Sequence, residues 1–97
     1  MKNTKKKFKL GRVIMTNGAK EMLEQEALVP PLIIKHLLKR HARGDWGDVD
    51  DEDKQLNNDS VSSGNRLVSS YTVSGEKVWV ITEADRSTTT LLLPEEY

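Results

Sequence analysis

Two short segments hold most of the side chains that could do chemistry. The first is His41-Ala-Arg-Gly-Asp-Trp-Gly-Asp48, and the second is Thr82-Glu-Ala-Asp-Arg-Ser-Thr88. Together they supply a histidine, carboxylates, arginines and hydroxyl groups, which suit metal-independent cleavage of RNA. In that chemistry Glu83 or His41 acts as general base and Arg86 binds the phosphate. Such a site forms only if both segments lie on the same side of the fold.

Both segments also have a structural interpretation, which their residue types favour. Two glycines allow a tight corner in the first segment, where Asp45 and Asp48 can accept backbone N–H groups and Trp46 can fill the edge of the core. His41 continues an apolar helical stripe, which indicates a hydrogen-bonded residue at the core edge. A charged turn between two strands is usually solvated, with Asp85 bonded to backbone amides.

Metal, thiol and nucleophile chemistry find little support. His36 and His41 lie five residues apart, about 140° around a helix, so they cannot bind one ion as an i, i+4 pair would. The acidic run 48–53 lacks the order of an EF-hand loop. The chain has no cysteine, and we see no nucleophile elbow and no glycine-rich phosphate loop. We therefore predict no metal and no cofactor.

The charges balance in number but separate along the chain. The 97 residues hold 15 basic and 15 acidic side chains, so the net charge is zero. Residues 1–20 carry seven bases and no acid, whereas residues 45–59 carry seven acids and one base. A zero net charge disfavours a plain nucleic-acid binder. The separation favours pairing of basic and acidic parts, within one chain or between two.

The pattern of apolar residues predicts an α+β fold. We expect a strand at 12–16, a helix capped by Thr16 and stopped by Pro30-Pro31, a helix at Pro31–Arg43 and a weaker helix at 50–63. Three strands then follow near 66–73, 78–82 and 88–93. The order β-α-α-(α)-β-β-β implies a three-stranded antiparallel meander with helices covering one face.

We divide the chain into a basic flexible arm, residues 1–8, and a single domain, residues 9–97. No apolar run is long enough for a signal peptide or a membrane span. With the lack of cysteine, this favours a cytoplasmic protein that does not bind membranes.

Apolar residues occur on both faces of the expected strands. One set is Val68, Trp79 and Ile81, and the opposite set is Leu67, Tyr71 and Val80. So few helices are not expected to cover both faces, which favours a homo-oligomer or a protein partner.

The chain resembles a family of small uncharacterised bacterial proteins that are common on plasmids and integrated mobile elements. The resemblance runs from about Phe8 to the end and is carried by Lys9-Leu-Gly-Arg-Val, by His41-x-Arg-Gly-Asp-Trp-Gly-Asp, and by Val78-Trp-Val-Ile-Thr-Glu-Ala-Asp-Arg-Ser-Thr-Thr-Thr-Leu-Leu-Leu-Pro-Glu-Glu-Tyr97. It implies a prokaryotic cytosolic setting and no established activity. Such proteins tend to have a shorter connection between the first two helices and an Ala/Leu-richer stretch at 57–63.

These observations favour a non-enzymatic accessory protein of a mobile element that binds a partner. One alternative is a small metal-independent ribonuclease, since the order of elements resembles messenger-RNA-cleaving toxins and barnase-like proteins. The other is a nucleic-acid-binding protein that uses the basic arm and the second helix, which we favour less. The candidate catalytic residues are His41, Glu83 and Arg86, and the candidate binding residues are Lys35, Lys39, Arg40, Arg43, Asp45, Trp46, Asp48 and Asp85.

Overall fold

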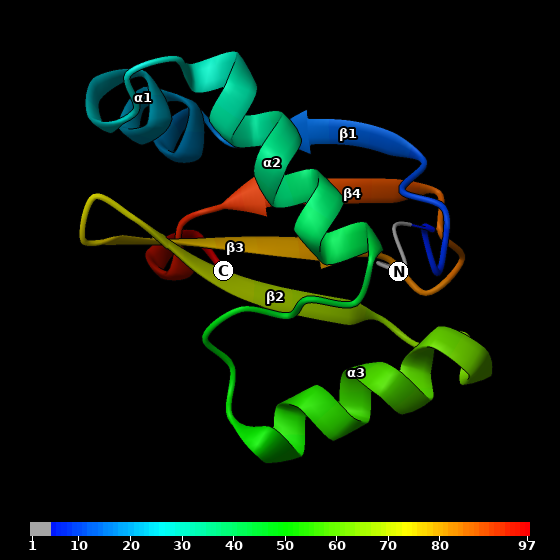
Figure 1. The fold of residues 1–97 in the computed structure, drawn as a ribbon. Coiled ribbons are helices and arrows are strands. Elements are labelled where there is room, and N and C mark those ends of the chain that lie inside the picture. Colours follow the sequence, from blue (N-terminus) through cyan, green and yellow to red (C-terminus); the bar gives the residue numbers. More distant parts are fainter. Residues whose placement is uncertain (1–4) are drawn as a thin grey trace.

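One strand, three α-helices and three further strands follow one another along the described part of the chain (Figure 1). The computed structural model describes residues 5–97. Its elements are β1 (Arg12–Met15), α1 (Asn17–Glu26), α2 (Pro30–Ala42), α3 (Asp51–Ser63), β2 (Leu67–Val73), β3 (Glu76–Thr82), β4 (Thr88–Leu92) and the short 3-10 helix η1 (Pro94–Glu96). The α+β class and the predicted order of elements are confirmed.

The four strands form one sheet in the order β1-β4-β3-β2. β2, β3 and β4 are antiparallel neighbours, as expected for a meander. β1 pairs with β4 and runs parallel to it, with Met15 opposite Leu91. Two parallel neighbours need a long connection along the chain, and here the segment that connects β1 to β4 contains every element from α1 to β3. β1 and β2 are therefore the edge strands.

Local capping explains where the helices begin and end. The Thr16 hydroxyl accepts a hydrogen bond from the Ala19 amide at the start of α1, as predicted. α2 begins at Pro30, one residue earlier than expected. α3 has polar residues that are poor helix formers, yet it runs to Ser63 because Asp50 caps its start and Gly64 ends it with a left-handed φ of 81°.

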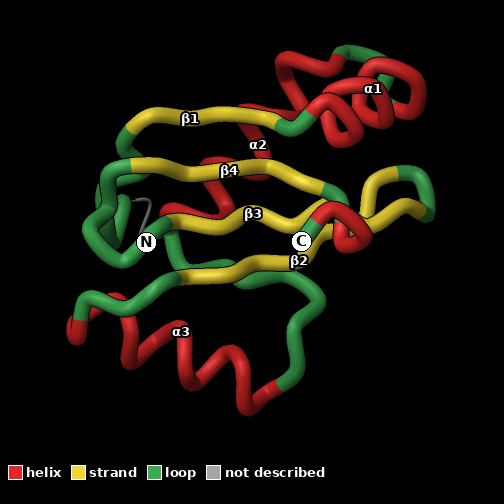
Figure 2. The backbone as a smooth tube through the Cα atoms, turned by 180° about the vertical axis from the view of Figure 1, so that it is seen from behind, coloured by secondary structure: helices red, strands yellow, loops and turns green. Residues whose placement is uncertain are grey.

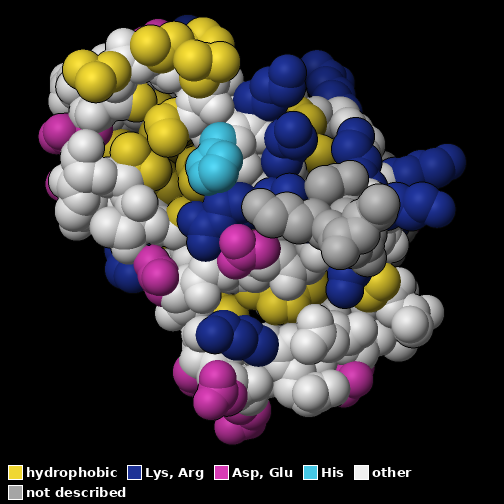
Figure 3. All heavy atoms as spheres, in the orientation of Figure 1, with side chains coloured by type: hydrophobic (Ala, Val, Ile, Leu, Met, Phe, Trp, Pro, Cys, Tyr) yellow, Lys and Arg dark blue, Asp and Glu magenta, His cyan; other side chains and the backbone are white. Residues whose placement is uncertain are grey.

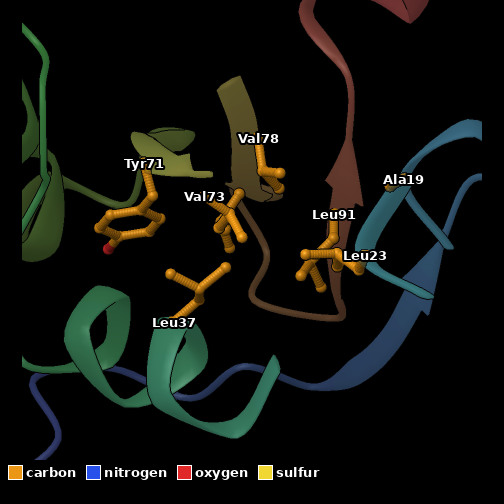
Figure 4. Packing of buried hydrophobic residues seen from close by; sticks show 8 residues of the cluster. Ala19, Leu23, Leu37, Tyr71, Val73, Val78 and Leu91 are labelled. Atoms are coloured by element: carbon orange, nitrogen blue, oxygen red, sulfur yellow. The ribbon is translucent and has the colours of Figure 1, made fainter. Parts of the chain in front are cut away.

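The main core lies between the sheet and the first two helices. α1 and α2 pack on one face of the sheet, and the buried side chains from both layers meet there (Figure 4). This cluster contains Ala19, Leu23, Leu37, Tyr71, Val73, Val78, Val80 and Leu91. α3 lies instead alongside β2, beyond the edge of the sheet (Figures 1 and 2). The expectation that all helices cover one face therefore holds for α1 and α2 only.

The opposite face of the sheet is partly covered by the chain itself. Ile81 and Leu92 are buried, and the ring of Tyr97 meets that of Trp79 edge to face at 5.5 Å between centroids. The apolar residues on this face are thus a weaker argument for a partner than the sequence suggested.

The N-terminal segment is attached to the fold at Lys7 and Phe8. The Lys7 amide donates to the Ala42 carbonyl at 2.7 Å, and Phe8 packs against the ring of His41. Residues 1–4 of the expected flexible arm lie outside the described residues. The described end of that arm therefore packs on the C-terminal end of α2.

Candidate functional site

His41 is fully buried and is part of a chain of hydrogen bonds that crosses the sheet. Its Nδ1 lies 2.6 Å from the Ser69 hydroxyl and its Nε2 lies 2.9 Å from the Thr82 hydroxyl. The Thr82 hydroxyl lies 2.7 Å from that of Thr89, which donates to the Leu10 carbonyl at 2.6 Å. The chain therefore joins α2 to β2, β3, β4 and the segment before β1.

Each hydroxyl has a single proton, so the direction of this chain follows from its last bond. Thr89 gives its proton to the Leu10 carbonyl, and Thr82 must then donate to Thr89. Thr82 consequently accepts from His41, whose Nε2 carries a proton. Nδ1 accepts from Ser69 when the imidazole is neutral and would donate to Ser69 if the imidazole were protonated.

The electrostatics of the site favour the neutral imidazole, with Nδ1 accepting from Ser69. Burial, with a smaller contribution from the positive charge of Arg86, lowers the pKa of His41 to about 3. A neutral imidazole could in principle serve as a base. Here, however, both nitrogens are engaged by hydroxyl groups and the side chain has no exposed surface.

Phe8 brings the two polar segments together. Its ring meets His41 edge-on at 5.2 Å and stacks on Trp46 at 6.1 Å with an interplanar angle of 15°. The guanidinium of Arg86 lies over the Phe8 ring, 5.7 Å from its centroid. The segments at 41–48 and 82–88 therefore meet, but around an aromatic cluster.

The charged groups of the second segment bind the chain itself. Arg86 donates to the carbonyls of Ser60 and Asn65, at 2.7 Å each, and so ties the end of α3 to the turn. Glu83 pairs with Arg66 at 3.2 Å. Arg86 and Glu83 thus face different partners and do not form an acid–base pair.

Asp85 belongs to the turn itself. Its carboxylate accepts from the hydroxyl and the amide of Ser87, at 2.6 and 3.0 Å, and these bonds lower its pKa. This agrees with the expected bonding of Asp85 to a backbone amide.

Asp45 and Asp48 each hold an ion pair at the corner after α2. Arg40 binds both carboxylate oxygens of Asp45, at 2.7 and 3.2 Å, and lies over the Tyr71 ring at 4.5 Å. This contact lowers the pKa of Asp45. Asp48 accepts from Thr72 and from Lys77, which also lower its pKa.

The corner also forms a strand-like contact with the outer side of β2. The Ser70 amide donates to the Trp46 carbonyl at 3.1 Å, and the Asp48 amide donates to the Ser70 carbonyl at 2.7 Å. Trp46 is buried, and its indole N–H donates to Asn58 of α3. The prediction that Trp46 fills the core edge agrees with this position.

Lys35, Lys39 and Arg43 lie on the basic side of α2. Lys35 and Lys39 are exposed and border a groove of about 570 Å³ between α2 and the N-terminal segment. Its floor is apolar, formed by Leu10, Pro31, Ile34 and Leu38, and Lys6 stands at its rim. Arg43 is half-buried at the end of the helix.

A second groove, of about 700 Å³, lies between α2 and the hairpin of β2 and β3. Three exposed apolar side chains line it, two from the turn between α1 and α2 and one from the first turn of α2. Leu28 is 102% exposed, Leu32 65% and Val29 49%. Figure 3 shows apolar side chains gathered over α1 and the start of α2, and basic side chains over the rest of α2.

Residues 5–97 contain no group of three or more His, Asp or Glu side chains placed to hold a metal ion. None of the helices in this range has the length and apolar character needed to cross a membrane. Comparison with protein-family models, curated proteins and solved structures found no match.

Several residues that build the site carry little signal in the sequence. Phe8, Ser69 and Thr89 act through tertiary contacts, and so does Asn57, whose amide binds the backbone of Val68. The single phenylalanine of the chain, inside a lysine-rich run, is the one signal that could have been noticed.

Proposed function

We propose that the protein is a non-enzymatic binding protein whose partner docks at the start of α2. The observation that carries this proposal is the exposure of Leu28, Val29 and Leu32, which line the groove between α2 and the hairpin of β2 and β3. Exposed apolar side chains that form a contiguous patch mark interaction surfaces, because burial against a partner removes them from water. The patch suits an apolar side chain of another protein.

The state of the candidate catalytic groups supports binding rather than catalysis. His41 is buried and doubly hydrogen-bonded, Arg86 binds backbone carbonyls, and Glu83 is paired with Arg66. Each group is engaged in holding the fold together. The setting we propose, an accessory role in the cytoplasm of a bacterium that carries a mobile element, rests on the motif resemblance.

Site-specific cross-linking tests this surface. A photoreactive amino acid replaces Leu32 in cells that encode the chain, and a matched protein carries it at Lys20, which is exposed on α1. We expect a discrete adduct with a different protein from position 32 and not from position 20. A second substitution, V29E, should abolish that adduct. Equal labelling from both positions, or adducts with the chain itself only, would contradict the proposal.

The ribonuclease hypothesis makes a separate prediction. Purified protein, H41A and R86A would be incubated with RNA in the presence of a chelator. Cleavage that is lost in both variants while they remain folded would replace the binding proposal with catalysis. Equal and negligible cleavage by all three proteins would leave binding as the function.

A further inference from the structure

We propose that the protein forms a two-fold symmetric dimer through the free side of β1, where β1 of a second copy adds antiparallel to it. β1 ends the sheet, with β4 as its only neighbour within residues 5–97. Figure 2 shows β1 at the margin of the sheet with no described helix or loop along its outer side. This surface is distinct from the Leu28 patch, so the two proposals stand independently.

The direction of the backbone groups shows what this edge offers. The Arg12 amide donates to the Ser87 carbonyl at 2.9 Å, and the Thr16 amide donates to the Leu91 carbonyl at 3.0 Å. Alternate residues of a strand point their N–H and C=O groups to opposite sides. Val13 and Met15 therefore direct theirs away from β4, which is the arrangement that a further strand recognises.

One antiparallel register uses all of these groups. With Ile14 opposite Ile14 of the second copy, Val13 lies opposite Met15 and Met15 opposite Val13. Each of these two pairs exchanges both of its N–H to C=O bonds, so the junction contains four. Because each strand makes the same contacts, the arrangement closes as a dimer.

The side chains in this register are compatible with burial. Val13 and Ile14 are each 41% exposed, and strand pairing would remove part of that apolar surface from water. The pairing also turns the two β1 strands into the centre of an eight-stranded sheet.

Charge complementarity selects the same register. Arg12 is exposed and lies opposite Thr16 of the second copy. In each chain the Thr16 hydroxyl and the Gly18 amide bind the carboxylate of Glu96, at 2.5 and 3.2 Å. Arg12 of each copy would therefore approach the Glu96 carboxylate of the other copy. In the registers centred on Val13 or on Met15, Arg12 lies opposite Ile14 or Gly18 instead of Thr16.

Cysteine cross-linking tests the register, because the chain has no cysteine of its own. Ile14 and its symmetry mate form a non-hydrogen-bonded pair, whose Cα atoms lie about 4.5 Å apart, within the range of a disulfide. We expect I14C to form a covalent dimer under mild oxidation. V13C is the matched control, since position 13 lies opposite position 15 and should remain largely monomeric. Equal cross-linking of both variants would overturn the register.

Sedimentation of the wild-type chain tests the dimer itself. We expect reversible dimerisation at tens to hundreds of micromolar, weakened roughly tenfold or more by V13K, which places a charge at the junction. L32E should leave the dimer unchanged, because Leu32 belongs to the other surface. A wild-type monomer over this range, or a dimer lost in L32E and kept in V13K, would overturn the proposal. Circular dichroism of each variant checks that it is folded.

Discussion

The two edges of the sheet differ in whether the rest of the chain binds the backbone groups of the edge strand. On the β2 side, which we call the covered edge, the corner at Trp46–Asp48 binds Ser70 and the Asn57 amide binds both backbone groups of Val68, at 2.8 and 3.1 Å. On the β1 side, which we call the free edge, Val13 and Met15 point their backbone groups away from the sheet.

The difference shows where the protein can add a strand. An unpaired edge invites another chain, and folds commonly block it with a loop, a bulge or a side chain. The covered edge uses an asparagine side chain and a tight corner, which satisfy backbone groups without a fifth strand. A dimer through the free edges would place two covered edges at its outside, so the sheet could not grow further.

The largest effect should come from breaking the covered edge at Gly47. This glycine has a φ of +75°, and a Cβ there would lie 2.0 Å from the Ser70 carbonyl oxygen. We expect G47A to destabilise the protein by about 4 kcal/mol or more in urea unfolding, because the corner must leave β2. Gly75 is the control, since it has a φ of +83° but open space around it.

G75A should therefore lose only about 1 to 2 kcal/mol, the cost of the left-handed backbone. Equal stabilities of G47A and G75A would show that the contact of the corner with β2 does not stabilise the protein.

The next largest loss of stability should occur at low pH, because His41 belongs to the hydrogen-bond chain that runs from β2 to the segment before β1. The pKa of His41 is about 3 in the folded protein and near its ordinary value of 6.5 in the unfolded chain. Between these values only the unfolded state binds the proton, so stability falls as pH falls from 6.5 toward 3 and is fully present above 6.5. We expect a loss on the order of 3 kcal/mol by pH 4.

Urea unfolding at several pH values between 7 and 4 measures this loss. H36Q, which removes the exposed histidine, should keep the same dependence. A flat profile in the wild-type protein would show that His41 is not held neutral in the fold. Below about pH 4, carboxylates with lowered pKa values, such as Asp45, add to the loss.

A smaller effect is expected from the Asn57 amide. N57A leaves the N–H and C=O groups of Val68 without their partners at the covered edge, which should cost about 2 kcal/mol. Q55A is the control, because it removes an exposed bond to Asp59 on the same helix. Similar stabilities for the two variants would indicate that water replaces Asn57 at β2.

The smallest effect on stability is expected at the free edge. Val13 is half-exposed and its backbone groups have no strand to lose, so V13K should change the unfolding free energy of the monomer by less than about 0.5 kcal/mol. Unfolding at a low protein concentration measures this without the dimer. A loss as large as that of N57A would show that β1 depends on Val13 for its own packing.

Much of the local structure could be predicted from residue types. The Thr16 cap, the helix after Pro30, the acidic start and glycine end of α3, and the turn at Ser74 follow from short-range chemistry, and each is present in the structure. The burial of Trp46 and His41 was also expected from their positions beside glycines and on an apolar stripe.

The site depends on contacts that no short-range rule contains. The bond between His41 and Thr82 joins residues 41 positions apart, and that between Thr89 and the Leu10 carbonyl joins residues 79 positions apart. Arg86, suggested by its chemistry as a phosphate-binding group, instead binds the carbonyl of Ser60 in α3. The partner of Arg86 depends on the position of the end of α3 and not on the turn that contains Arg86.

The sequence by itself determined the α+β class, the element order and the separation of charge, because propensity, capping and charge are properties of neighbouring residues. Only the tertiary structure decided that β1 lies beside β4 and that β2 is covered by Asn57 and the corner. Which edge of the sheet stays free depends on strand order, and strand order is set by the packing of distant segments around one core.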